Sequence, residues 1–151
     1  MLTTETALAE NLMAHVLGLR RLVRRRVRTR LPGLVPLRGA QIELLRVLEE
    51  EPGIGVAAAA RALHLAGNSV STLVNQLVDA GMLTRSIDEA DRRAVRLALT
   101  LAARERLDVW RRTRTEVVAN TLATLSEKDR KALADALPAM RRLTNALMEE
   151  A

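Results

Sequence analysis

The sequence has no cysteine, no tyrosine and no phenylalanine, and its single tryptophan is Trp110. Without cysteine the chain cannot form disulfides, cysteine-based zinc sites or thiol redox switches. With so few aromatic rings, a core must be built from leucine, valine, alanine, isoleucine and methionine. We expect neither a metal nor a cofactor.

Groups that carry catalysis are also scarce. The chain has two histidines, His15 and His64, and it lacks a glycine-rich loop of the kind that cradles phosphates. The three consecutive glutamates at 49–51 are typical of a solvated helix end rather than of a catalytic carboxylate pair. We therefore predict that the protein is not an enzyme.

Long apolar runs are missing too. No stretch approaches the ~18 apolar residues of a transmembrane helix, and the first residues lack the basic and then apolar pattern of a signal peptide. We expect a soluble, cytoplasmic protein. Its 151 residues fit a single domain over 1–151, and 48% apolar and 28% charged residues are typical of a globular chain.

Positive charge is what the chain has in excess. Its 24 basic residues against 18 acidic ones give a net charge of +6, and all basic residues except Lys128 and Lys131 are arginine. Such an excess favours a polyanionic partner. Arginines crowd residues 20–30, where they could attract DNA or form a solvated helix face whose long stems cover apolar surface.

The middle of the chain predicts a helix-turn-helix. Residues 56–63 predict a short alanine-rich helix, 64–67 a turn, and 68–80 a second helix for which Gly81 is a natural C-cap. Apolar residues recur in the second helix at the spacing of one buried face. They are Val70, Leu73, Val74, Leu77 and Val78.

Small polar residues occupy the opposite face of this second helix. Asparagine and glutamine can pair with adenine in a major groove, and a helix N-terminus can bind a phosphate. The candidate DNA-binding residues here are Asn68, Ser69, Ser71, Thr72, Asn75 and Gln76. The alternative is a plain amphipathic surface helix, but such helices usually carry glutamate, lysine and arginine, whereas this face has only Asp79 charged. We predict a DNA-recognition helix.

A β-hairpin is predicted behind the helix-turn-helix. Residues 82–85 and 95–99 predict paired strands, and Val95, Leu97 and Leu99 alternate with other residues so that they share the buried face. We interpret the hairpin as a wing, with Arg85 as a further candidate DNA contact. The fold class is therefore mainly α with a small β-hairpin wing, a winged helix-turn-helix.

The tip of this wing, residues 86–94, carries paired arginines, Arg92 and Arg93. Asp91 could orient Arg93 through a carboxylate–guanidinium bond, and the oriented guanidinium could enter a narrow minor groove. The alternative is that Asp91 merely caps the turn and both arginines lie in solvent. We predict contact between the wing and the minor groove.

These residues resemble the MarR (multiple antibiotic resistance regulator) family. The resemblance rests on Ala58–Leu63, Val70-Ser71, Leu77, Gly81–Leu83, Arg85, Asp91-Arg92-Arg93 and Leu97–Thr100. The Asp-Arg-Arg wing followed by Leu-Thr is the specific part. The resemblance implies a winged-helix DNA-binding lobe over 37–99, with dimerisation helices over 1–31 and 100–151. Thr72 departs from the family, because this position is often arginine in relatives.

The resemblance also implies a function. We expect a sequence-specific DNA-binding transcriptional regulator, a homodimeric repressor that binds a pseudo-palindromic operator in double-stranded DNA and is relieved by a small-molecule effector. Arg38 is expected to contact a phosphate, as the equivalent position does in relatives. His15 and Trp110 could line the effector cleft, although an exposed histidine and a packed tryptophan are the simpler interpretation. The alternative function is a protein-interaction module without specific DNA binding.

The terminal helices support the dimer independently. Apolar residues recur by three and four over 8–27 and 133–147, which is more apolar surface than one small lobe can bury. Ser126 and Asp129 predict the start of the last helix. Pro138 lies within that helix and predicts a kink or a local break.

Overall fold

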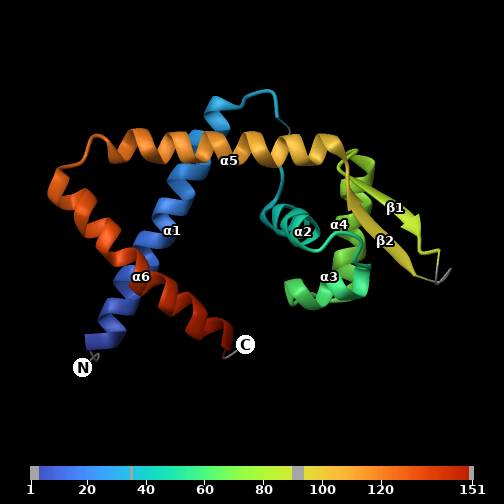
Figure 1. Ribbon diagram of the computed structural model, residues 1–151, viewed down its shortest axis with the longest axis horizontal. Coiled ribbons are helices and arrows are strands. Elements are labelled where there is room, and N and C mark those ends of the chain that lie inside the picture. The colour runs from blue at the N-terminus through green and yellow to red at the C-terminus, as the bar shows by residue number, and fades with distance from the viewer. Residues whose placement is uncertain (1–3, 35, 90–93, 150–151) are drawn as a thin grey trace. The chain divides into compact units, whose positions relative to one another are not determined.

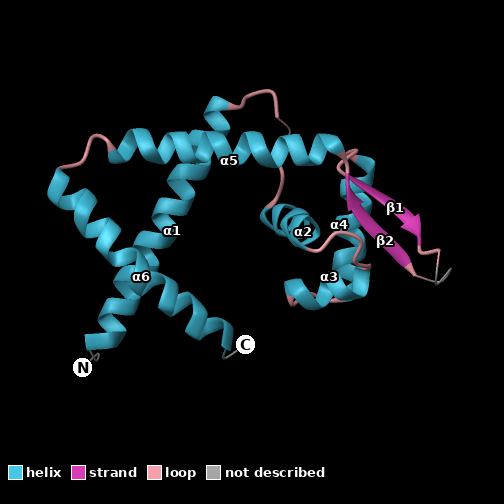
Figure 2. Cartoon of the chain, in the orientation of Figure 1, coloured by secondary structure: helices cyan, strands magenta, loops and turns pink. Residues whose placement is uncertain are grey.

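The computed structural model describes residues 4–34, 36–89 and 94–149. Helices dominate this described part of the chain, and within it one two-stranded hairpin follows the fourth helix (Figures 1 and 2). The elements are α1 (Thr4–Arg30), α2 (Gly39–Glu50), α3 (Val56–Leu63), α4 (Gly67–Asp79), β1 (Leu83–Ile87), β2 (Val95–Leu99), α5 (Leu101–Leu122) and α6 (Glu127–Glu149). The predicted fold class, mainly α with a small hairpin wing, is confirmed.

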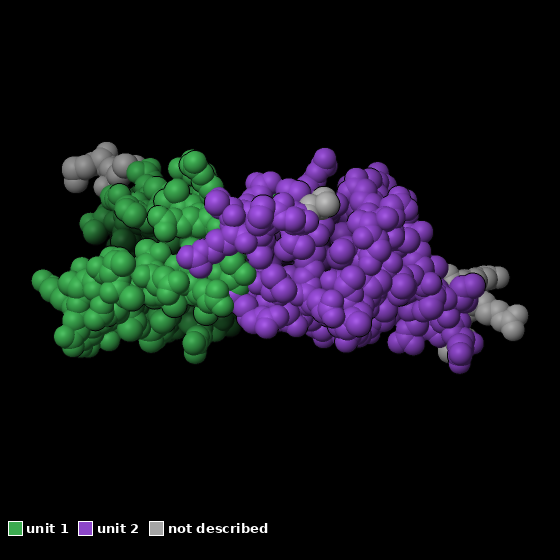
Figure 3. All heavy atoms as spheres, turned by 90° about the horizontal axis from the view of Figure 1, so that it is seen from above, with its two compact units in different colours: residues 1–27, 113–151 green, residues 28–112 purple. Residues whose placement is uncertain are grey.

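The chain divides into two compact units (Figure 3). We call residues 28–112 the winged-helix unit, which contains α2, α3, α4, the hairpin and the first half of α5. Residues 1–27 and 113–151 form the terminal unit, which contains most of α1, the rest of α5 and all of α6. No helix in the parts of the chain that the structure describes is long and apolar enough to cross a membrane.

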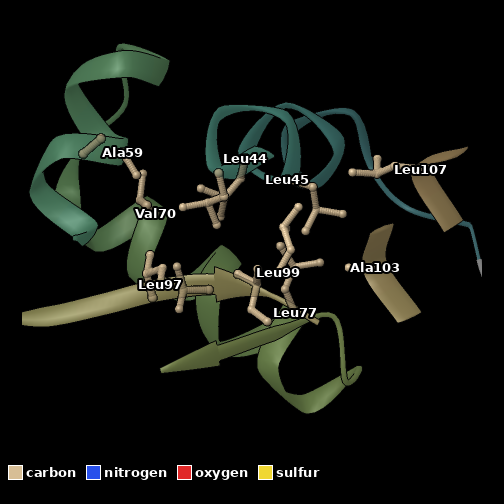
Figure 4. Close-up of a cluster of buried hydrophobic side chains, with 13 residues drawn as sticks. Leu44, Leu45, Ala59, Val70, Leu77, Leu97, Leu99, Ala103 and Leu107 are labelled. Carbon is tan, nitrogen blue, oxygen red and sulfur yellow. The ribbon is translucent and has the colours of Figure 1, made fainter. Parts of the chain in front are cut away.

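The winged-helix unit has an aliphatic core. Leu44 and Leu45 on α2 converge with Leu77 on α4 and Leu97 on β2, and all four side chains are fully buried (Figure 4). Burying a side chain of this size stabilises a fold by about 1.5–3 kcal/mol. Ala59 on α3 is also fully buried. The predicted buried face of α4 is confirmed, since Val70 and Val74 are 0% exposed as well.

Two left-handed residues shape the helix-turn-helix. Gly81 has φ +71°, and it ends α4 while Met82 N–H donates to the Leu77 carbonyl at 2.8 Å. The predicted glycine C-cap is therefore confirmed. His64 has φ 52° and ends α3 in the same way, with Leu65 N–H donating to the Ala60 carbonyl at 3.0 Å. Residues other than glycine are uncommon in this conformation, and histidine is among those that adopt it more often.

The hairpin is antiparallel, with Leu83 opposite Leu99 and Ile87 opposite Val95. The far edge of β2 pairs with the loop between α2 and α3, because Leu97 N–H donates to the Ile54 carbonyl at 3.0 Å. The prediction that Val95 shares the buried face of Leu97 was wrong. Val95 is 40% exposed, because it pairs with the exposed Ile87 at the wing end of the strand, beyond the reach of the core.

The hydroxyl groups of Thr100 and Ser126 cap the N-termini of α5 and α6. Thr100 Oγ1 accepts a hydrogen bond from Ala103 N–H at 3.2 Å and donates one to the Gly81 carbonyl at 2.7 Å, so it joins the start of α5 to the end of α4. Ser126 Oγ accepts from Asp129 N–H at 3.1 Å at the start of α6, as predicted. Of the kink or local break expected at Pro138, the break was wrong, because α6 runs without interruption from Glu127 to Glu149. A kink at Pro138 stays a prediction.

Candidate nucleic-acid interface

The polar face of α4 lies in solvent. Its opposite face is anchored by the fully buried Val70, Val74 and Leu77, which fix the rotation of the helix about its axis. The predicted base-reading residues Asn68, Ser69, Thr72, Asn75 and Gln76 are all exposed, and Ser71 is half-buried. The helix therefore presents a rigid, almost uncharged polar surface. Rigid presentation of this kind lowers the cost of binding, because few groups must be ordered.

In the first turn of α4, side chains form hydrogen bonds with backbone groups of the same turn. Asn68 Oδ1 accepts a hydrogen bond from Ser69 N–H at 2.8 Å, and Thr72 Oγ1 donates to the Asn68 carbonyl at 3.0 Å. The Asn68 side chain is therefore already hydrogen-bonded to the backbone of its own helix. A phosphate at this end would have to replace the Asn68 side chain to reach the Ser69 N–H.

Asn75 and Gln76 are each held by a residue from another element. The Arg85 guanidinium on β1 donates to Asn75 Oδ1. Gln41 Nε2 on α2 donates to Gln76 Oε1 at 3.1 Å. The two adjacent amides of α4 are thereby fixed by the hairpin on one side and by α2 on the other.

Gln41 is a site residue that the sequence analysis missed. Its Oε1 accepts a hydrogen bond at 2.8 Å from the backbone N–H of Arg38, the residue that caps the N-terminus of α2. Glutamine three residues after a cap is one half of a capping box, and that spacing was visible in the sequence. The bond to Gln76 was not, because it joins residues 35 positions apart.

Cationic side chains flank the polar face. Arg38 at the start of α2 and Arg85 on β1 are both exposed, as a role in phosphate contact requires. Guanidinium groups stay charged at neutral pH. Even for Arg106 on α5, where burial lowers the pKa below its ordinary value, the starting value is high enough to keep the charge.

The tip of the wing lies outside the described residues, so Asp91, Arg92 and Arg93 stay predictions. The base of the wing is described. Asp88 N–H donates to the Ala94 carbonyl at 2.9 Å, and the Asp88 carboxylate lies 3.8 Å from Nη1 of Arg96. Arg96 Nε also donates to the Gly53 carbonyl at 3.2 Å. Arg96 therefore ties the wing to the loop between α2 and α3.

The two candidate effector residues lie in different units. His15 on α1 is exposed, and its Nδ1 lies 2.7 Å from the Asn11 carbonyl oxygen. Trp110 on α5 is half-buried in the winged-helix unit. Their pairing in one cleft stays a prediction.

A charged hollow was not foreseen from the sequence. It lies within the winged-helix unit and is lined by Glu49, Pro52, Leu99, Arg104 and Asp108. Arg111 donates from its two terminal nitrogens to Glu49 and to Asp108, both at 2.8 Å. Through these two ion pairs Arg111 joins Glu49 of α2 to Asp108 of its own helix, α5.

Residues 36–94 match the model of the MarR family. This range begins just before α2 and ends within the wing, so it spans the helix-turn-helix and the face that carries Asn75 and Gln76. Over this range the chain is similar to the MarR family. A comparison with curated protein sequences found no match.

Solved structures share this fold over nearly the whole chain. A MarR family protein from Bacillus stearothermophilus is 22% identical with a TM-score of 0.72, covering 95% of this chain and 99% of its own. FabT from Streptococcus pneumoniae, in complex with DNA, is 19% identical with a TM-score of 0.70, covering 92% and 99%. S. aureus MepR bound to ethidium bromide is 19% identical with a TM-score of 0.62, covering 87% and 95%.

Proposed function

We propose that this protein is a sequence-specific DNA-binding transcriptional regulator, with α4 in the major groove and the wing, residues 86–94, at the minor groove. The observation that carries the proposal is the polar face of α4, which is exposed and nearly free of charge while its opposite face is fully buried. Small uncharged polar side chains suit close approach to base edges. The MarR-family segment supports the same role, and the DNA complex of FabT has the same fold.

The protein is proposed to act as a homodimer held by the terminal unit. Leu8 and Leu19 on α1 and Leu147 on α6 are each more than 60% exposed, and no residue of α6 between 127 and 149 is buried. Exposed apolar surface along two helices is typical of an interaction site. We propose that a second copy of the chain covers this apolar surface. A two-fold dimer presents two recognition helices to a pseudo-palindromic operator whose half-site centres lie about 34–36 Å apart.

We further propose that the protein is a repressor and that a small-molecule effector relieves the repression. This role is supported by the MarR-family segment and by the shared fold of S. aureus MepR, which binds ethidium bromide. Trp110 is the only tryptophan and is half-buried, so its emission reports on its surroundings without a label. Ethidium bromide added to the DNA-free protein should change this emission, and unchanged emission would count against a site for such cations near Trp110.

The experiment that tests DNA binding is a selection from randomised duplexes followed by mobility shifts at several salt concentrations. A regulator enriches one pseudo-palindrome and binds it at least about 10³-fold more tightly than random duplex. Equal affinity for all duplexes, or no binding, would instead favour the alternative of a protein-interaction module without specific DNA binding.

A further inference from the structure

We propose that Gln41 is a positioning residue that turns the Gln76 amide so that α4 presents hydrogen-bond donors to DNA, and thereby selects guanine over adenine at the base read by Gln76. This inference rests on the proposed function. Beyond that function, guanine is the base expected opposite Gln76, and Gln41 of α2 is the residue that sets this preference.

The orientation follows from a chain of donors and acceptors. A backbone N–H can only donate, so the Gln41 atom 2.8 Å from the Arg38 nitrogen must be the oxygen Oε1. The other end of the Gln41 amide is then the NH₂ group, which donates. The Gln76 atom that it meets at 3.1 Å must therefore be Oε1. The orientation of both amides is thereby fixed, although the oxygen and nitrogen of an amide cannot be told apart by shape.

The free end of Gln76 is consequently a donor. Its Nε2 has no hydrogen-bond partner among the described residues, and Gln76 is exposed. Asn75 has the same polarity, because a guanidinium can only donate and Arg85 is bonded to Asn75 Oδ1. Two adjacent amides thus have their oxygens engaged by the protein and their NH₂ groups available.

This polarity has a consequence for base choice. In the major groove guanine offers two acceptors, N7 and O6, whereas adenine offers the acceptor N7 beside the donor N6–H₂. A bidentate pair between glutamine and adenine needs the glutamine oxygen to accept from N6–H₂. In this protein that oxygen faces Gln41, so the exposed NH₂ group matches guanine and opposes the adenine pair.

Gln41 is well placed to hold this orientation. It is half-buried at the start of α2, one turn before the fully buried Leu44 and Leu45. Its two hydrogen bonds join one helix end to another helix, so rotation of the Gln76 amide would break a link between two packed elements. A base-reading group supported in this way is pre-organised.

Gln41→Glu is the variant that tests the orientation. Its carboxylate still accepts from the Arg38 N–H but cannot donate, so Gln76 must turn its NH₂ group inward and its oxygen toward DNA. Gln41→Leu removes both bonds and leaves the Gln76 amide free to turn. Ala40→Glu is the matched control, because it adds the same charge at the neighbouring exposed position of α2.

The readout is selection from randomised duplexes with the full-length protein and each variant, after circular dichroism has shown each to be folded. Gln76→Ala identifies the base position that Gln76 sets, as the one position per half-site where preference is lost. At that position we expect guanine for the wild type, a shift toward adenine of about tenfold for Gln41→Glu, and near-equal bases for Gln41→Leu. Ala40→Glu should weaken binding to all sequences without changing the preferred base.

Several outcomes would overturn the inference. One is adenine at the Gln76-dependent position in the wild type, and another is an unchanged base preference in folded Gln41→Glu. Both leave the proposed function intact, because a sequence has still been selected. If the wild type selects no sequence at all, the proposed function fails first and this inference fails with it.

Discussion

The Arg85 guanidinium on β1 donates a hydrogen bond to the Asn75 side-chain oxygen on α4. One residue thus joins the hairpin to the proposed recognition helix, and both partners are exposed. Arg85 can therefore act in two ways, as a positive charge near the phosphate backbone and as the group that fixes the Asn75 amide. The two roles differ in what they do to binding, so substitutions can separate them.

Arg85→Ala should weaken DNA binding and also relax the base preference set by Asn75. Charge loss lowers affinity for every sequence, and each lost phosphate contact reduces the log–log salt slope by ~0.9, or ~1.8 for the two copies in a dimer. Arg85→Lys keeps the charge but loses the planar fork. We expect Arg85→Lys to retain the wild-type salt slope and to lose preference at the Asn75 position. Full preference in both Arg85→Lys and Arg85→Ala would mean that Arg85 does not position Asn75.

His64 provides a prediction about stability. Its φ of 52° costs an L-residue with a Cβ about 1–2 kcal/mol, and glycine avoids that cost while losing about 0.5–1 kcal/mol of backbone entropy on folding. His64→Gly should therefore raise the free energy of unfolding by about 0.5–1 kcal/mol. His64→Ala is the control, since it keeps a Cβ and should give no gain. Urea unfolding at one fixed protein concentration measures both, and a stabilised His64→Ala would contradict the explanation.

The terminal unit gives a prediction about assembly. Leu137 on α6 is 58% exposed, and placing a charge there should disrupt an apolar dimer interface. We expect Leu137→Glu to sediment as a monomer at micromolar concentration and to lose high-affinity binding to the operator. Asn145→Glu adds the same charge at an exposed position on another side of α6 and should remain dimeric. A folded monomer of the wild type at that concentration would reject the homodimer itself.

Much of this fold could be predicted because its signals are local. Residues 56–63 form α3 as predicted, and glycine at 81 ends α4 because only a few residues tolerate its backbone conformation. The prediction was wrong where residues distant in the sequence decide whether a side chain is buried. Val95 fits the alternation of its strand, but the core does not extend to its end of the hairpin.

The candidate site could also be predicted only in part. Periodicity alone showed which face of α4 is exposed, and therefore which side chains are candidates. It could not show that Asn75 and Gln76 are held by Arg85 and Gln41, because those bonds exist only once α2 and the hairpin have packed against α4. The polarity that these residues present to a base is a tertiary property.

The wing gives the sharpest electrostatic prediction, because two interpretations differ in sign. If Asp91 positions Arg93, then Asp91→Ala should weaken DNA binding even though it removes a negative charge near phosphates. Coulomb repulsion alone predicts tighter binding. Mobility shifts with the selected operator at two salt concentrations decide between them, and tighter binding by a folded, dimeric Asp91→Ala would reject the positioning role.

Arg93→Ala completes the test of the wing. If the guanidinium pairs with phosphate, the two copies in a dimer together account for ~1.8 of the log–log salt slope, and the slope should fall by that amount. If it lies within the minor groove, the slope changes less and A·T-rich flanking sequences lose their advantage, since their narrow groove is what attracts arginine. Arg96→Ala is the comparison at the described base of the wing, where Arg96 is bonded to the Gly53 carbonyl and lies near Asp88. It should lower the free energy of unfolding with little change in the salt slope, because that guanidinium is already engaged by the protein.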